Sequence, residues 1–194
     1  MKPFFPLSVF LLPGEDIPLR IFEPRYLQLI EESKQEGYTF VIPYLKDDDI
    51  TSTGCEVKLR QVVAETTQGK KVITVESVSL VRIISFSKKA EGKLYPAGVV
   101  ERIAPFGGIS NRELMQLVIH YTDEYDQHFL EEADESNLCL LDIARALNLS
   151  SDDKYELINL EDVRLMEKFL INQMHYLMLI RKQEQLLGND FGLN

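Results

Sequence analysis

Residues 5–26 read FPLSVFLLPGEDIPLRIFEPRY and hold more structural information than any other segment of the 194-residue chain. Hydrophobicity alternates from Leu7 to Leu12, which predicts a β-strand. Pro13-Gly14 then predicts a tight turn, because proline presets φ and glycine tolerates a positive φ. Residues 16–22 alternate again, so the segment predicts two strands joined by a turn.

The second predicted strand has one apolar face, formed by Ile17, Leu19 and Ile21. Its other face carries Pro18, Arg20 and Phe22. Because Pro18 has no N–H to donate to a neighbouring strand, we expect an edge strand or a bulge. Glu23-Pro24 predicts the start of a helix, with proline at its first position, and Gly37 predicts its end.

Composition limits the classes of partner. The chain carries 31 acidic and 21 basic residues, a formal net charge of −10, which disfavours binding to nucleic acid or to an anionic membrane surface. The longest apolar runs are too short to span a bilayer and no signal-type pattern opens the chain, so we expect a cytoplasmic protein. Two cysteines far apart indicate neither a disulfide framework nor a zinc site.

The sequence pattern divides the chain in two. Short predicted strands fill the first part, at 40–45, 55–64, 72–86 and 94–102, with a bulge near Glu76-Ser77 where the alternation slips by one residue. Pro105-Phe106-Gly107-Gly108 marks a change to helical periodicity. Ser110 with Glu113 predicts a capping box, Ser150 or Ser151 can cap a later helix, and a long helix is predicted at about 160–187. We therefore predict a β-rich domain over 1–104 and a helical subdomain over 109–194.

The chain resembles the N-terminal substrate-recognition domain of Lon proteases. The resemblance begins with residues 5–26, in the order of their strand, turn, strand and helix signals and in their residue types. It continues in Gly54-Cys55-Glu56-Val57, in 72–83, in 138–144 and in 152–164. It implies an α+β fold, a PUA-like antiparallel pseudo-barrel followed by a small C-terminal helical bundle. It also implies that residues 1–104 recognise protein substrates.

A Lon protease also needs an ATPase with a G-x-x-x-x-G-K-[ST] loop and a domain with a Ser–Lys pair. The sequence contains no such loop, and it ends at Asn194, where the ATPase of the family would begin. We therefore expect a non-catalytic module without cofactor or metal, which binds unfolded or extended protein segments through a groove or by strand pairing. An adaptor in protein quality control is one such role.

The residues predicted to contact a peptide are Arg20, Phe22, Arg25, Met166, Met174 and Met178. The methionines lie on the last helix, where apolar residues occur on nearly all sides. This helix is either covered by the rest of the protein or offers an adaptable surface to peptides or to a second copy. For a homodimer, the expected seam consists of Met166, Leu170, Met174, Leu177 and Ile180.

Two other functions stay open. A cleft containing Glu15, Asp16 and Glu23 predicts a hydrolase if strongly perturbed carboxyl groups converge there. A PUA-like fold predicts RNA binding if a local basic face forms from Lys58, Arg60, Lys70, Lys71 and Arg82. The three histidines form no H-E-x-x-H motif, and Asp47-Asp48-Asp49 lacks the spacing of a calcium loop, so no metal site is expected.

Overall fold

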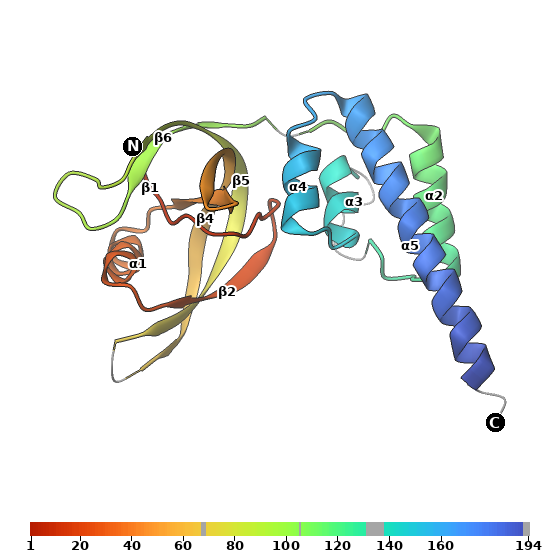
Figure 1. Ribbon diagram of the computed structural model, residues 1–194, viewed down its shortest axis with the longest axis horizontal. Helices are drawn as coiled ribbons and strands as arrows, with labels where there is room; N and C mark the ends of the chain where they lie inside the picture. Colours follow the sequence, from red (N-terminus) through yellow and green to blue (C-terminus); the bar gives the residue numbers. More distant parts are fainter. Residues whose placement is uncertain (67–68, 105, 131–137, 192–194) are drawn as a thin grey trace. The chain divides into compact units, whose positions relative to one another are not determined.

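The computed structural model describes residues 1–66, 69–104, 106–130 and 138–191 (Figure 1). The chain forms two compact units, Met1–Ala104 and Pro105–Asn194, called the β unit and the helical unit below. The β unit contains β1 (Lys2–Pro3), β2 (Asp16–Ile21), α1 (Pro24–Glu36), β3 (Phe40–Lys46), β4 (Asp49–Glu65), β5 (Lys71–Ser87) and β6 (Ala97–Arg102). The helical unit contains α2 (Arg112–Glu124), α3 (Leu140–Ala146), α4 (Ser151–Ile158) and α5 (Val163–Phe191). The predicted α+β class is confirmed.

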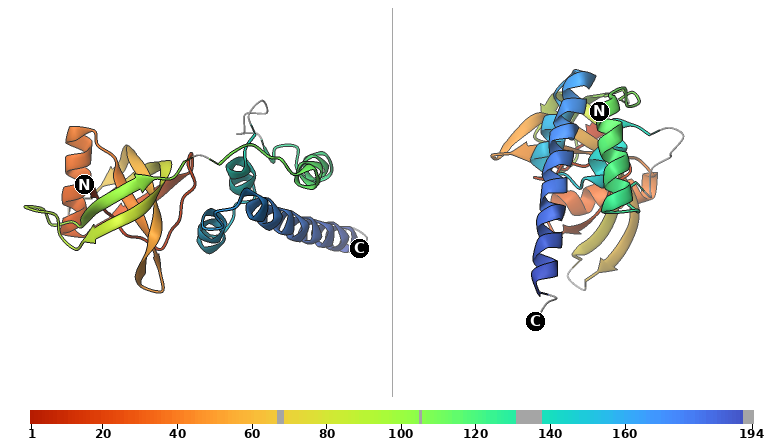
Figure 2. Two further views of the ribbon diagram at one scale, coloured as in Figure 1. Left: turned by 90° about the horizontal axis from the view of Figure 1, so that it is seen from above. Right: turned by 90° about the vertical axis from the view of Figure 1, so that its right-hand side faces the viewer.

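The long strand β5 organises the sheet, whose pairs are all antiparallel. β4 runs along one edge of β5, and the other edge is shared by β2 near the start of β5 and by β6 near its end. β3 pairs with β4, which gives the order β1-β6-β5-β4-β3 with β2 attached to β5. Figure 2 shows the resulting strong curl of the sheet.

The first residues of the chain join the two ends of this sheet. β1 pairs with β6 through Lys2 and Gly98, and the chain then turns to run parallel to β3. There the N–H of Phe5 donates to the carbonyl of Val41 at 2.8 Å, and the N–H of Leu45 donates to the carbonyl of Leu7 at 2.9 Å. The curled sheet is therefore closed into the predicted pseudo-barrel.

Bulges produce the curl. The pairing of β4 with β5 shifts between Glu56 and Val57, which face Ser79 and Ser77, so Val78 is the extra residue. An extra residue bends its strand and increases the local twist. The predicted bulge near Glu76-Ser77 is thus confirmed, displaced by one residue.

The opening segment differs from its prediction in one respect. Pro13-Gly14 forms the predicted turn, with Gly14 at φ 89° and the N–H of Glu15 donating to the carbonyl of Leu12 at 3.1 Å, as in a type II turn. The predicted strand over Leu7–Leu12 is wrong, because only Leu7 makes an isolated bridge there. Phe10, Leu11 and Leu12 are all buried, so this segment lacks the solvent-exposed face that the alternation predicted.

Helix α1 begins and ends where its sequence signals predict, and it covers the sheet. Pro24 occupies its first position, and Gly37 ends it in the left-handed region at φ 71°. The buried residues of α1 are Tyr26, Leu29, Ile30 and Ser33. They face a core that also contains Phe5, Leu11, Ile21, Phe40, Ile42, Cys55, Val57, Ile73, Val75 and Tyr95.

Helix α2 begins one residue later than the capping pattern predicts. The N-cap is Asn111, whose Oδ1 accepts hydrogen bonds from the N–H groups of Glu113 at 2.9 Å and Leu114 at 3.3 Å. Ser110 instead donates its N–H and its hydroxyl to Glu167 Oε1 at 2.7 and 2.9 Å. The predicted Ser110 cap is wrong because a buried carboxylate 57 residues away takes both of its donors.

We expect Asn111→Ala to destabilise the helical unit by about 1 kcal/mol, since the substitution leaves two N–H groups of α2 without their acceptor. Hydrogen exchange of the α2 amides would measure this loss. Asn172→Ala, at an exposed position inside α5, is the matched control and should change stability by less than about 0.5 kcal/mol. Equal protection of α2 in wild type and Asn111→Ala would contradict the cap.

One face of α5 belongs to the core of the helical unit. Met166, Leu170 and Met174 are completely buried there, and Leu177 and Ile180 are half-buried. The prediction that these five residues form an exposed seam is therefore wrong, because α2, α3 and α4 pack against α5. Apart from Val163 in the first turn, the exposed apolar residues described on α5 lie on the opposite face.

Candidate peptide-binding surface

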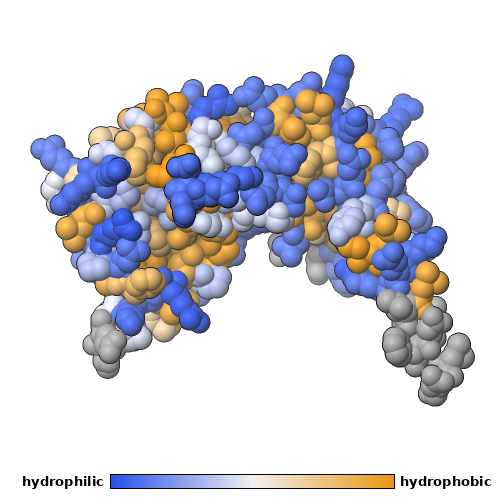
Figure 3. Space-filling model, in the orientation of Figure 1, coloured by the Kyte–Doolittle hydropathy of each residue, from blue (hydrophilic) through white to orange (hydrophobic). Residues whose placement is uncertain are grey.

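The six predicted contact residues fall into two separate sets. Arg20, Phe22 and Arg25 belong to the β unit, where β2 leads into α1. Met166, Met174 and Met178 belong to α5 in the helical unit. Figure 3 shows that both units expose apolar residues among hydrophilic ones, so exposure of the individual side chains decides which of the six can bind.

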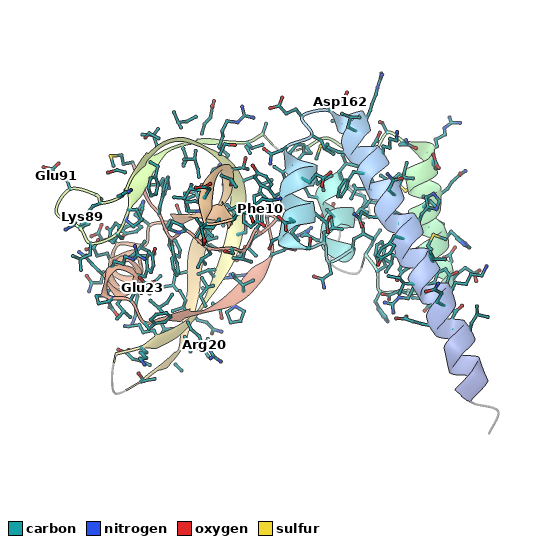
Figure 4. All side chains as sticks on the ribbon, in the orientation of Figure 1. Phe10, Arg20, Glu23, Lys89, Glu91 and Asp162 are labelled. Carbon is teal, nitrogen blue, oxygen red and sulfur yellow. The ribbon has the colours of Figure 1, made fainter. Side chains whose placement is uncertain are left out.

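Among the phenylalanines whose side chains are described, Phe22 is the most exposed, with 63% of its surface accessible. It follows Ile21, the last residue of β2, which is 1% exposed. Since successive strand residues point to opposite faces, burial of Ile21 in the core directs Phe22 outward. Arg20, labelled in Figure 4, is also exposed, and because it lies two residues before Phe22 the alternation directs both side chains to the same side. We call Arg20, Phe22 and Arg25 the β2–α1 corner.

Arg25 is held in place by two neighbours. Its guanidinium donates to Glu23 Oε2 through Nε at 2.9 Å and pairs with the same oxygen through Nη2 at 2.7 Å. The guanidinium also lies over the ring of Tyr26, 4.5 Å from its centroid, a cation–π contact. Tyr26 packs on Phe5 with ring centroids 4.1 Å apart, and burial raises the pKa of its hydroxyl. This anchoring fixes one wall of the corner.

Arg20 differs from Arg25, because its side chain makes no ion pair or hydrogen bond with any described residue. It lies on an edge strand, since within the described ranges β2 pairs with β5 alone. Pro18 in the middle of β2 lacks an N–H, so a strand added to this edge would have an interrupted ladder. The corner therefore offers an aromatic ring and a cation rather than a continuous strand edge.

Ion pairs tie α1 to the strands behind the corner. Lys71, opposite Ile21 in the β2–β5 pairing, is buried and pairs with Glu31 of α1 and with Glu65 of β4 at 3.4 Å. The hydrogen bond from Lys71 lowers the pKa of Glu31. This contact joins helix and hairpin next to the corner.

A second network joins α1 to the β5–β6 loop. Glu32 accepts hydrogen bonds from Tyr95 at 2.5 Å, Lys93 at 2.9 Å and Gln28 at 2.9 Å. Burial would raise the pKa of Glu32, but these hydrogen bonds outweigh it and lower the pKa to about 2. Helix α1 is therefore fixed on both sides, and the corner rests on a rigid element.

The methionines divide by exposure. Met166 and Met174 are completely buried, so neither can contact a peptide in this conformation, and both belong to the core of the helical unit. Met178 is half-buried. The sequence could not separate these positions, because apolar residues occur on nearly every side of α5.

Of the three carboxyl groups considered for hydrolysis, those of Glu15 and Glu23 have structural partners, and Asp16 is exposed at the start of β2. Glu15 accepts a hydrogen bond from the N–H of Leu12 at 2.8 Å, which stabilises the Pro13-Gly14 turn, and Glu23 pairs with Arg25. Burial raises the pKa of the Cys55 thiol to about 12, which leaves it without nucleophilic thiolate. In the described part of the chain, no group of three His, Cys, Asp or Glu residues could hold a metal ion.

Three of the five basic residues considered for RNA binding pair with acidic residues. Lys58 and Arg60 both pair with Glu76 Oε2, at 3.0 and 2.5 Å, and Lys71 is buried between Glu31 and Glu65. These pairs weaken a phosphate-binding face in a chain of net charge −10. No described helix is long and apolar enough to cross a membrane.

Sequence reasoning missed Glu56, a polar residue of the β unit with several hydrogen-bond donors around it. Glu56 is buried in β4 and accepts hydrogen bonds from Thr39 at 2.5 Å, Lys2 at 2.7 Å, Ser79 at 3.0 Å and Arg102 at 3.2 Å. Burial would raise the pKa of Glu56, but the four donors lower it to about 2. One signal was present, since Glu56 lies between the apolar residues Cys55 and Val57 of a predicted strand.

Comparison with known proteins identifies the family of this chain. The model of the ATP-dependent protease La (LON) substrate-binding domain matches residues 2–175. The structure of a Lon N-terminal domain protein from Xanthomonas campestris is similar over 92% of this chain and 96% of that chain, with 21% identity and a TM-score of 0.65. The N-terminal domain of Lon protease from Mycobacterium avium complex is similar over 90% of this chain and 97% of that chain, with 17% identity and a TM-score of 0.61. Curated proteins give no significant match.

Proposed function

Because the chain belongs to the substrate-binding domain family of the ATP-dependent protease Lon, we propose that it is a non-catalytic adaptor that binds unfolded or extended protein segments in the cytoplasm. The exposed Phe22 ring at the β2–α1 corner carries this proposal. A phenylalanine exposed beside two arginines fits a segment with apolar and acidic side chains. Glu23 and Tyr26 hold Arg25 on one side of the corner, which reduces the ordering of the protein that opposes binding.

The proposal favours side-chain contacts over strand addition. Pro18 interrupts the hydrogen-bonding edge of β2, whereas Phe22 and Arg20 present an apolar ring and a cation without a partner among the described residues. Affinity for one short segment should be weak, in the micromolar to millimolar range, because ordering a flexible peptide offsets much of the gain from burial.

We expect Phe22→Ser to weaken binding of a 15-residue peptide rich in Phe, Leu and Asp by about tenfold, because the ring supplies most of the apolar contact area. Titration followed by NMR would measure the dissociation constant. Ile84→Ser is the matched control, since Ile84 is 57% exposed in the same unit and lies on β5 outside the corner.

An equal loss of affinity in both variants would remove the corner from the proposal. Tight binding of single-stranded RNA with a steep salt dependence, alongside no peptide binding, would favour the RNA alternative. ATP hydrolysis that copurifies with the chain and survives removal of contaminating enzymes would contradict a non-catalytic role.

A further inference from the structure

The outer face of α5 carries a row of apolar residues that no other described element covers. Leu165, Tyr176, Leu179 and Leu186 are 50, 63, 55 and 60% exposed, although the opposite face of the same helix is buried. Figure 3 shows apolar surface alternating with hydrophilic surface along α5. Since the helical unit has a core of its own around Met166, Leu170 and Met174, this face is not needed for that core.

The spacing of the row is that of a coiled-coil seam. Steps of four and three residues connect Leu165, Phe169, Asn172, Tyr176, Leu179, Gln183 and Leu186. This is a repeat of 3.5 residues, with leucine at three of its four d positions. A repeat of this kind predicts that the partner is another α-helix, whose apolar side chains pack between those of α5. We call these seven residues the outer seam.

Charge selects among helical partners. Lys168, His175 and Lys182 occupy successive g positions along one side of the outer seam. All three are exposed, and the side chains of Lys168 and Lys182 make no ion pair within the described ranges. His175 lies 4.0 Å from Glu113 of α2. This basic row in a chain of net charge −10 is complementary to an acidic flank.

The same row disfavours two other occupants. In an antiparallel pair of identical helices, the g positions of both copies face each other, so Lys168 and Lys182 would meet lysines. An anionic bilayer would be repelled by the net charge of −10, and Asn172 and Gln183 place amides where a membrane-bound helix needs apolar residues. In a helical pair, by contrast, a polar residue within the seam sets the register of the partner.

We propose that the outer seam of α5 binds an amphipathic helix with an acidic flank from another protein. This site is separate from the β2–α1 corner and does not depend on the peptide-binding function proposed for it. It would let the module bind a client segment through the β unit and a helical partner through the helical unit.

The test uses the full chain and two 21-residue peptides with leucine at every a and d position. One peptide has glutamate at all e and g positions and the other has lysine, so that neither pairs well with itself. We expect the glutamate peptide to bind at least tenfold more tightly than the lysine peptide at low salt. Lys168→Glu with Lys182→Glu should reverse this preference, and Tyr176→Ser with Leu179→Ser should weaken both complexes at least fivefold.

Lys88→Glu with Lys89→Glu is the matched control, because it makes the same change in net charge at exposed positions of the β unit. It should preserve the preference for the glutamate peptide. Phe22→Ser should also leave this binding unchanged, which separates a failure of this proposal from a failure of the corner.

Equal affinity for both peptides, or no binding of the glutamate peptide at 1 mM, would overturn the proposal. So would an equal loss of the preference for the glutamate peptide in Lys88→Glu with Lys89→Glu. A wild-type dimer that Leu179→Ser dissociates would also overturn it. Binding to vesicles containing 30% phosphatidylserine, abolished by Lys168→Glu with Lys182→Glu, would assign the seam to a membrane instead.

Discussion

Gly98→Ala should destabilise the β unit by about 3 kcal/mol or more, the cost of overpacking at a site with no room to relax. A methyl group at this position of β6 would collide with the carbonyl oxygen of Ser85 and would lie 2.5 Å from ring atoms of Phe4. Neither neighbour can move cheaply. Ser85 is part of the β5–β6 pairing, and Phe4 is completely buried and stacks on Phe86 with ring centroids 6.1 Å apart.

The collision lies where the barrel closes. Lys2 pairs with Gly98 and Phe4 bridges to Val41, so a shift of β6 would separate the two ends of the sheet. Urea denaturation with hydrogen exchange of the strand amides would report on the β unit separately from the helical unit. Gly107→Ala is the matched control, because a methyl group there meets nothing within 4 Å, and it should be neutral within about 0.5 kcal/mol. Equal stability of the two variants would show that Phe4 does not need a glycine beneath it.

Local stereochemistry explains the parts of the fold that were predictable. The turn at Pro13-Gly14 and the helix between Pro24 and Gly37 follow from φ preferences that the residues carry with them. The predicted strands at 40–45 and 72–86 were likewise found, as β3 and β5. Along the first half of β5 buried residues alternate with half-buried ones, so a period of two is sufficient there, whereas β3 is buried on both faces.

Long-range contacts explain what was not predictable. Ser110 fits a capping box, but Glu167 of α5 takes its donors, and the cap moves to Asn111. The periodicity of α5 predicts a helix without saying which side is inside, and burial placed Met166 and Met174 in the core. The corner was partly predictable, since the alternation of residues 17–22 puts Arg20 and Phe22 on one face. The partners of Glu56 come from parts of the chain up to 54 residues away, which no local pattern connects.

Glu56→Gln should destabilise the β unit by about 3 kcal/mol at pH 7. Glu56 accepts from Lys2, Thr39, Ser79 and Arg102, and a carboxamide replaces one of its two acceptor oxygens with a donor facing other donors. The side chains of Lys2 and Arg102 are 40 and 67% exposed and can turn to water, which limits the loss. Its control is Glu101→Gln, the same change at an exposed position of β6, expected to be neutral within about 0.5 kcal/mol.

The effect of Glu56→Gln should depend on pH in a defined direction. The pKa of Glu56 is lowered from 4.5 to about 2 in the folded state. Its charged form therefore contributes stability that is fully present above about pH 4.5 and is lost as pH falls through about 2. Wild type should lose stability faster than Glu56→Gln across this window, and the two unfolding free energies should converge near pH 2. Glu32, whose pKa is also about 2, stays in both proteins and cancels from the difference. A difference between the two proteins that stays constant from pH 7 to pH 2.5 would show that Glu56 acts through its shape and not through its charge.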